Sequence, residues 1–482
     1  VSLCAFSSLN ASSEDIPPML AVTKEAVFDQ KRPLEQEFKM SVPNGFTVVA
    51  VGDCISSRPL YQKTQTDQNL GKVAKILQGA SVTFGNLETS ILDLRTCRDA
   101  TPQGCSDWPL RAESGVADDF RMFGFKMFSR ANNHALDWGV AGMRETTKNL
   151  EAVHLVHAGS GENSGEAYAP RYFDSESRIG LVSTATSFNE LSQAMPPSRG
   201  GAPGRPGIST IKVTQNIVVK PEMFKQLSLI KYDLDVLDNG PGQKACAEED
   251  REMEFLDRTF IVGDSMGYDY QMDEKDLKDF LISVRAGKPY SDFLIATVHS
   301  HESYGNRDKL ANFLPVLAHK AIDSGADVFL VHGSHVLGPI EIYKNRVVAY
   351  GLGNFFWSDI QGPLSQELYD INDSIIKKTF VNPQEVTDAE LSLTLNANGF
   401  ADERMFQSII ILSKYDNGHL VEVKLYPIDL GYGNKLSQSG IPHLASPEIG
   451  KKILTRIQVL SEQFGTRINI QEDGTGAIIL AH

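Results

Sequence analysis

The segment MFSRANNHALDWG, residues 127–139, places two asparagines and a histidine directly after an apolar run. Asn132, Asn133 and His134 combine amide oxygens, which can ligate a metal, with an imidazole that can carry a proton near neutral pH. Asparagine is also common in turns, and a histidine beside an apolar run is often an ordinary hydrogen-bonded residue. This cluster alone therefore leaves its role open.

Four other apolar runs end in the same kinds of residue. FTVVAVGD ends at Asp53, SVTFGNLE at Asn86 and Glu88, DFLIATVHSHE at His299, His301 and Glu302, and ADVFLVHGSH at His332 and His335. Because open α/β sheets place ligand sites at the carboxyl ends of their strands, we expect these side chains to meet. Their oxygen and imidazole donors suit divalent Mn, Fe, Zn or Mg. Two such cations can hold a phosphoryl group and activate water, while a nearby histidine protonates the leaving oxygen.

The elements that must position these residues alternate along the chain as short apolar strands and amphipathic helices, which predicts the α/β class. NLGKVAKILQG carries Leu70, Val73 and Leu77 on one helical face. Near the end of the chain, Ser446 is the expected N-cap and Pro447 the first residue of a further helix.

Composition limits the function classes and the domain plan. A formal net charge of −15 offers no basic face to nucleic acid, and no apolar run is long enough to span a bilayer. Residues 1–40 are expected to be a signal remnant and extension, 41–360 the main domain, and 361–482 C-terminal strands and a helix packed on it. Within the main domain, residues 189–258 are expected to form a long insertion or lid, too poor in apolar residues for a core of its own.

The N-terminal segment and the cysteines bear on location. VSLCAFSSLNASSED resembles the end of a secretory signal, which favours a secreted or periplasmic protein. Cys97 and Cys105 bracket the polar loop CRDATPQGC, so a disulfide between them is expected in an oxidising compartment, and two free thiols in a cytosolic protein are the alternative.

One rival motif is GDSMG, Gly263 to Gly267, which matches the G-x-S-x-G elbow of serine hydrolases. That elbow needs a helix that begins at the serine, but the next helical pattern begins near Asp273. We therefore do not expect Ser265 to be a nucleophile.

The motifs VGD, GNLE, ANNHALDWG, VHSHE and VHGSHVLGPIEIYKNRVVAYGLGNFFW together resemble the CapA family of bacterial capsule or poly-γ-glutamate biosynthesis proteins. That family is similar to the calcineurin-type metallophosphoesterases. The resemblance implies a four-layer α/β sandwich with a strand-rich C-terminal part. It also implies a site for two divalent cations and an anionic substrate.

Carried over position by position, the resemblance implies six metal ligands: Asp53, Glu88, Asn133, His299, His332 and His335. His134 corresponds to the acid, and Arg58 matches an arginine that could bind an anion through two hydrogen bonds. The chain also departs from the metallophosphoesterase pattern. Cys54 and Ile55 follow Asp53 where Asp-x-His is usual, and the last two histidines are spaced HxxH rather than HxH. One of the two metal sites is therefore expected to be weaker.

Several of these residues also have simpler interpretations. Asp53 could cap a helix and Glu88 could be a solvated loop acid, while Asp137 either orients His134 or is the N-cap of a helix over residues 139–152. Asn354 either orients a ligand through its amide or fills a turn. The remaining substrate-binding predictions, expected to face the substrate or to surround the ligands, are Asn86, His301 and Glu302.

We therefore expect a metal-dependent hydrolase of a phosphoester or related bond, linked to capsule or poly-γ-glutamate biosynthesis. Its substrate is expected to be an anionic small molecule or polymer, and membrane-bound capsule synthesis proteins are its expected partners. The alternative is a component that binds or exports an anionic capsule polymer without turnover. Such a component needs a long groove rich in Lys and Arg, which the acidic composition does not favour.

Overall fold

The computed structural model describes residues 34–103, 108–239, 250–303, 308–358, 364–399 and 402–480. The expected signal remnant up to residue 33 lies outside these residues. So do Cys4, Cys105 and Cys246, and the predicted Cys97–Cys105 disulfide remains a prediction.

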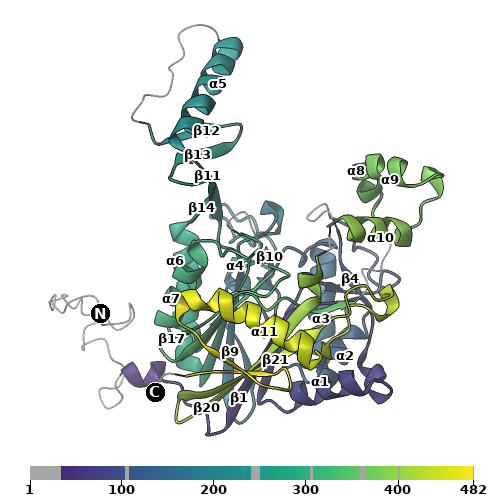
Figure 1. The fold of residues 1–482 in the computed structure, drawn as a ribbon, viewed down its shortest axis with the longest axis vertical. Coiled ribbons are helices and arrows are strands. Elements are labelled where there is room, and N and C mark those ends of the chain that lie inside the picture. The colour runs from purple at the N-terminus through teal and green to yellow at the C-terminus, as the bar shows by residue number, and fades with distance from the viewer. Residues whose placement is uncertain are drawn as a thin grey trace, which may run out of the picture.

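Two large sheets form the body (Figure 1). The ten-stranded sheet has the order β23 (Ile468–Ile470), β24 (Gly476–Ile478), β21 (His419–Asp429), β20 (Gln407–Asp416), β1 (Phe46–Ser56), β2 (Val82–Leu87), β5 (Met127–Ser129) and β6 (Val156–Ala158), with β19 (Asn354–Ser358) beside β1 and β22 (His443–Leu444) beside β21. The six-stranded sheet has the order β17 (Ile340–Tyr343), β18 (Arg346–Ala349), β16 (Val328–His332), β15 (Phe293–His299), β9 (Arg178–Ala185) and β8 (Arg171–Asp174). These mixed sheets confirm the predicted α/β class.

The pairing of the strands brings their carboxyl ends to one edge of each sheet. β1 is parallel to both β2 and β19, so that Asp53 lies beside Asn86 on one side and beside Asn354 on the other. In the other sheet β15 and β16 are parallel, with His299 beside His332. The polar residues at the strand ends are therefore neighbours within each sheet, as the sequence predicted.

Three buried clusters hold the sheets and helices together. One contains Phe84 and Phe293 and joins the two sheets, and helix α11 (Pro447–Ser461) packs against it through Ile453. A second packs α1 (Gln68–Gln78), α2 (Val116–Phe123) and α3 (Gly139–Ala152) on the ten-stranded sheet. A third packs α6 (Glu274–Gly287) and α7 (Phe313–Asp323) on the six-stranded sheet. Both sheets are thus held between apolar layers that fix the strand ends.

Local sequence explains where the helices begin. Asp67 caps α1, because its Oδ1 accepts hydrogen bonds from the backbone of Asn69 and Leu70, both at 3.0 Å. Ser446 caps α11 in the same way by accepting the backbone N–H of Ile449 at 3.3 Å. The apolar face predicted for α1 and the N-cap predicted for α11 are confirmed.

A first projection stands off the body where the insertion was expected (Figure 1). It comprises β11 (Val213–Val219), α5 (Pro221–Asn239), β12 (Glu252–Phe255), β13 (Arg258–Val262) and β14 (Gly267–Met272). The expectation that this segment has no core of its own differs from the structure, since Val219, Phe224 and Met253 form a small buried cluster. The rest of the projection is held together by the pairing of its strands. Apolar periodicity in the sequence could not reveal this pairing.

The order of elements in this projection also shows whether the rival serine motif can form a nucleophile elbow. Ser265 lies between β13 and β14, and α6 begins only at Glu274 with Asp273 as its N-cap. No helix begins at Ser265, as the sequence predicted, so the geometry of a nucleophile elbow is absent there.

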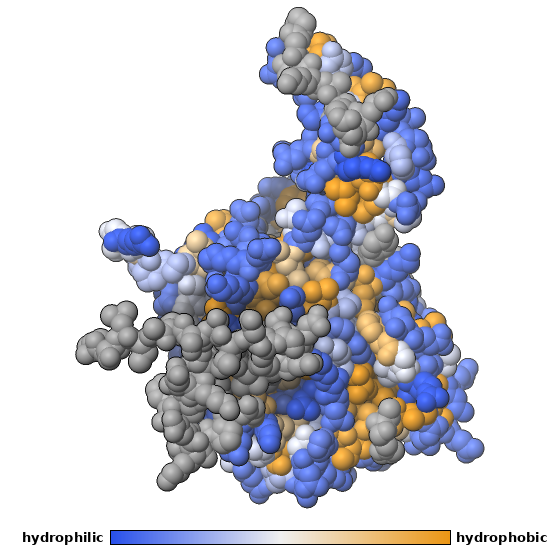
Figure 2. Space-filling model, turned by 90° about the vertical axis from the view of Figure 1, so that its left-hand side faces the viewer, coloured by the Kyte–Doolittle hydropathy of each residue, from blue (hydrophilic) through white to orange (hydrophobic). Residues whose placement is uncertain are grey.

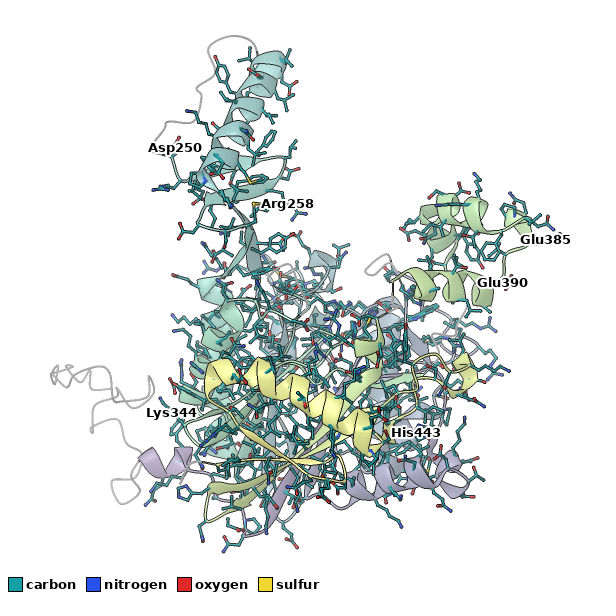
Figure 3. All side chains as sticks on the ribbon, viewed as in Figure 1. Asp250, Arg258, Lys344, Glu385, Glu390 and His443 are labelled. Atoms are coloured by element: carbon teal, nitrogen blue, oxygen red, sulfur yellow. The ribbon has the colours of Figure 1, made fainter. Side chains whose placement is uncertain are left out.

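A second projection comprises α8 (Gln366–Ile371), α9 (Asp373–Thr379) and α10 (Asp388–Gly399). It follows β19 in the chain, whereas the first projection follows β10 (Gly207–Ile208). Both rise on the same side of the body in Figure 1, and Figure 3 labels Asp250 and Arg258 on the first and Glu385 and Glu390 on the second. Among the described helices, none combines the length and the apolar character needed to cross a membrane.

His157 on β6 makes the stability of this fold depend on pH. Burial, reinforced by the charges of Arg130 and Arg171, lowers the pKa of His157 from 6.5 to about 3. The unfolded chain therefore binds a proton that the folded chain excludes between these values, and stability present above pH 6.5 is lost as pH falls toward 3. We expect the free energy of unfolding to fall by about 2 kcal/mol between pH 7 and pH 5 through this residue. Urea titrations at both values should show that His157→Gln removes this part of the pH dependence, and an unchanged slope would contradict it.

Candidate metal centre

Glu88 lies at the centre of the strand-end cluster. Its side chain is completely buried, and its Oε1 is 3.5 Å from Nε2 of His299. The Nε2 atoms of His134, His301 and His335 are each 3.9 Å from the same oxygen. Within the described residues, no N–H or hydroxyl group donates to either carboxylate oxygen of Glu88, and the carboxyl group of Asp53 is near enough to share a proton with it. Four imidazoles thus converge on one buried acid, which is not a solvated loop residue.

The cluster offers two overlapping sets of ligand atoms. Glu88, His299 and His301 form one set, and Asp53, Glu88 and His335 form the other, with all ligand atoms in each set within 4.8 Å of one another. A buried carboxylate without a donor is costly unless a cation neutralises it. Nitrogen and oxygen donors without a thiolate suit Mn, Zn, Fe or Mg. The residues present therefore fit divalent cations, with Glu88 shared between the two sets.

The electrostatics of the two acids lead to the same conclusion. Burial raises the pKa of Asp53 to about 7, even though Asn86 and the backbone of Gly333 donate hydrogen bonds to it at 2.9 and 3.2 Å. Burial, together with the negative charges of Asp53 and Asp137, raises the pKa of Glu88 well above its usual value. Cations bound between Asp53 and Glu88 would favour the charged form of both acids.

Asn354 fixes the orientation of His335. The Asn354 amide nitrogen donates to the carbonyl of Met405 at 2.9 Å, so its oxygen faces His335 and accepts from Nδ1 at 2.8 Å. The proton on Nδ1 leaves the Nε2 lone pair directed toward Glu88, which is the tautomer that a ligand needs. Asn354 therefore does more than fill a turn, since its amide orients His335.

A left-handed turn makes this convergence possible. Gly333 has φ +93° and His335 has φ +56°, a region that residues other than glycine rarely adopt. A Cβ on Gly333 would lie 2.9 Å from ring atoms of both His299 and His301. Only glycine therefore lets the chain pass this close to the two histidines.

His134 is paired with Asp137. Its Nδ1 is 2.8 Å from Oδ2 of Asp137, which also accepts the backbone N–H of Leu110 at 2.6 Å. Helix α3 begins at Gly139 with Trp138 as its N-cap, so Asp137 does not cap it. Asp137 therefore orients the imidazole and leaves Nε2 facing Glu88.

The two asparagines of the NNH motif behave differently. Asn133 Oδ1 is buried and, among the described residues, accepts no hydrogen bond, which is consistent with a ligand atom. Asn132 was not predicted as a site residue, yet its Oδ1 accepts the backbone N–H of His134 at 3.1 Å, and its amide nitrogen donates to Leu87 O at 2.7 Å and to Asn86 Oδ1 at 3.2 Å. Asn132 thus ties the β5 loop to β2. Nothing in the sequence indicates which of the two adjacent asparagines has this structural role.

His332 lies elsewhere than the ligand role requires. Its Nε2 is 3.1 Å from the carbonyl of Val51 and its Nδ1 is 3.1 Å from Oγ1 of Thr297. Burial lowers the pKa of His332 to about 4, so the ring is neutral and both nitrogens already have partners. His332 belongs to neither set of ligand atoms, whereas His301, expected to face the substrate or surround the ligands, belongs to one, with its Nε2 2.9 Å from that of His299.

Two predicted substrate-binding residues have other contacts. Glu302 accepts hydrogen bonds from the hydroxyls of Thr186, Ser187 and Ser300 at 2.6 to 3.0 Å. Arg58 donates from Nη2 to the carbonyl of Ser437 at 3.1 Å. Glu302 therefore links the loops that follow β9 and β15, and Arg58 links the loop after β1 to Ser437. Which hydroxyls or carbonyls a distant loop offers is not visible in the sequence.

A cavity of about 110 Å³ adjoins the cluster. His301, Gly333 and His335 line it, and Leu314 and Tyr350 contribute apolar surface. A small group bound in this cavity would lie beside His301 and His335.

Comparison with known proteins is consistent with this geometry. Residues 47–358 match the model of a family described as bacterial capsule synthesis protein PGA_cap. The uncharacterized protein y4sH of Sinorhizobium fredii is 40% identical over 461 residues, covering 91% of this chain and 94% of that protein. The capsule biosynthesis protein CapA of Bacillus anthracis is 23% identical over 365 residues, covering 73% of this chain and 71% of its own. The PGA biosynthesis protein CapA of Bacillus subtilis is 22% identical over 312 residues, covering 63% and 61%. The family model matches more than half of the chain and includes every strand end of the cluster, so the chain belongs to the bacterial capsule synthesis PGA_cap family.

Proposed function

We propose that the protein is a divalent-metal-dependent hydrolase of a phosphoester or related bond, with a fold of the metallophosphoesterase type. The observation that carries the proposal is the buried Glu88 carboxylate, which has four imidazole nitrogens within 3.9 Å and no N–H or hydroxyl donor among the described residues. A structural core does not need this arrangement, because unpaired buried acids lower stability.

Five side chains would hold the cations, and Asn133 is the sixth candidate. They are Asp53, Glu88, His299, His301 and His335. When bound, divalent cations supply Lewis acidity and lower the pKa of an attacking water. Asn86, Gly333 and Asn354 orient these ligands through the hydrogen bonds described above.

His134 would supply the proton to the leaving oxygen. Asp137 accepts from Nδ1 and stabilises the imidazolium, so the transferable proton is carried on Nε2, the nitrogen that faces Glu88. The pairing resembles the orientation of a catalytic histidine by a carboxylate in other hydrolases. Asp137 acts through His134 and does not itself contact the substrate.

The names of the relatives supply the biological context. Two are named for capsule or PGA biosynthesis, and we infer that this chain acts on an anionic substrate of such a process, outside the cytoplasm and beside membrane-bound partners. Binding of an anionic polymer without turnover is the competing proposal. A net charge of −15 opposes that proposal, and binding without turnover does not require the pairing of His134 with Asp137.

Metal reconstitution tests the proposal. The purified chain is stripped with a chelator, reloaded with Mn²⁺, Zn²⁺, Fe²⁺ or Mg²⁺, and assayed with aryl phosphate monoesters and diesters. We expect stoichiometric metal and hydrolysis that depends on it. Metal bound without hydrolysis of any ester would favour the binding module, and no bound metal would contradict both the site and the reaction.

His301 and His332 give a matched pair of variants. We expect His301→Ala to reduce metal occupancy, because its Nε2 belongs to a ligand set. His332→Gln should retain metal but lower the free energy of unfolding by about 1 to 3 kcal/mol, because it disturbs the buried bonds to Val51 and Thr297. Elemental analysis and urea titration of both variants check this. Metal lost from His332→Gln and kept by His301→Ala would restore the ligand set expected from the sequence.

A further inference from the structure

The helix of the first projection exposes an unusual amount of apolar surface. Of the 19 residues of α5, only Phe224 is buried. Its exposed large apolar side chains are Met223 at 38%, Leu229 at 55%, Ile230 at 50%, Leu234 at 41% and Leu237 at 79% exposure. Figure 2 shows the projection standing clear of the body, with apolar surface on it. This surface lies away from the metal centre and has no part in the proposed reaction.

The spacing of these residues is that of a coiled-coil seam. Met223, Leu227, Ile230, Leu234 and Leu237 follow one another at intervals of four, three, four and three residues. Sustained over two heptads, this spacing places them in one stripe at positions a and d. Leu227 packs partly against the projection's own buried cluster, so the open part of the stripe runs from Ile230 to Leu237.

The residues that follow α5 directly in the chain offer no large apolar side chains that could cover the stripe. Residues 240–249, GPGQKACAEE, contain no Leu, Ile, Val, Met, Phe, Tyr or Trp. The geometry of an a/d stripe suits another helix, whose side chains fit between those of α5.

Charge indicates which helix would fit. Residues 213–272 carry six basic and twelve acidic residues. In the heptad that places Leu234 at a, Asp233 occupies g and Asp238 occupies e, the positions that face a partner helix. Lys231, at the other e position, is already paired with Asp235 at 2.7 Å. A parallel second copy would place the g-position acid of one helix opposite the e-position acid of the other, whereas a helix with Lys or Arg at these positions would complement them.

We propose that the α5 stripe, Ile230, Leu234 and Leu237 with Met223, docks an amphipathic helix of a partner protein that carries Lys or Arg beside its apolar seam. The apolar stripe supplies affinity, and the acids beside it select the basic partner over a second copy of this chain. The proposal does not depend on the reaction catalysed at the metal centre, and the two can fail separately.

Two synthetic peptides test the proposal. Both are helices of four heptads with Leu and Ile at a and d, and they differ only in Lys or Glu at e and g. Fluorescence anisotropy with the full chain at physiological salt should give micromolar binding of the Lys peptide and at least tenfold weaker binding of the Glu peptide. The double variant I230A/L234A should bind the Lys peptide with at least tenfold lower affinity than the unaltered chain.

Leu229→Ala is the matched control, because Leu229 is equally exposed on the same helix but lies outside the stripe. We expect it to bind as the unaltered chain does, which separates the stripe from general attraction between a basic peptide and an acidic protein. Equal binding by I230A/L234A, equal binding of both peptides, or no binding would overturn the proposal. Sedimentation should show no dimer that depends on Ile230 and Leu234, since such a dimer would mean that a second copy occupies the stripe.

Discussion

Replacing His134 with alanine should lower turnover of an alkyl phosphoester by about 10² to 10⁴, the usual contribution of a general acid. Metal content and folding should remain nearly unchanged, because Nε2 of His134 is outside both ligand sets. The loss should be smaller for nitrophenyl esters, whose leaving group needs no proton. Turnover of both ester types and elemental analysis of the variant measure these effects.

Asp137→Asn provides the companion measurement. Asp137 holds the proton on Nδ1 of His134, so the variant should shift the alkaline limb of the pH profile, where the acid loses its proton, and lower kcat more than it changes KM. A structural defect alone would not move the pH profile in this way. If His134→Ala lost its metal, His134 would be a ligand. If it kept full activity on an alkyl ester, another group would be the acid.

Glu88→Gln should abolish metal binding and activity together, because Glu88 belongs to both ligand sets. The metal-free variant should unfold at the same or a higher temperature than the metal-free parent, since the replacement removes a buried acid without an N–H or hydroxyl donor. Added metal stabilises only a protein that binds it, by about 2.7 kcal/mol at a hundredfold excess over Kd. Thermal melts with and without Mn²⁺ should therefore show an upward shift for the parent and none for Glu88→Gln.

Glu302→Gln is the control for this result. Glu302 follows His301 directly in the chain. Its oxygens accept hydrogen bonds from three hydroxyls, so they are not free to bind a cation. We expect this variant to keep its metal and its metal-dependent shift in melting temperature. Retention of metal by Glu88→Gln would contradict the proposed centre.

Sequence patterns predicted which strands meet and which residues stand at their ends. Asp53, Glu88, His299 and His335 were expected as ligands, and the structure brings all four together. This was possible because a buried parallel strand is an apolar run whose end is visible in the sequence, and the ends of adjacent strands must be neighbours.

The direction of each side chain beyond a strand end could not be predicted. His332 differs from expectation because its ring nitrogens lie beside Val51 and Thr297, and His301 because its loop turns Nε2 toward His299; no periodicity encodes either contact. Hydrogen bonds across the fold, such as that from Asn354 to His335, depend on elements distant in sequence. In the first projection, RTFIV reads as a strand, but the sheet around it was not predicted, since its strands are mostly half-exposed and pair over long distances in the chain.

The hydrogen bonds that hold the ligands have a consequence for cation discrimination. Asp53 is held by Asn86 and Gly333, and His335 by Asn354, so these two proposed ligands are positioned by residues that are not ligands themselves. Ligands fixed in this way limit how far the site can contract around a smaller ion or expand around a larger one. Ionic radius and preferred geometry should therefore decide which metal it retains, and a cation of the wrong size should exchange quickly even when it is abundant.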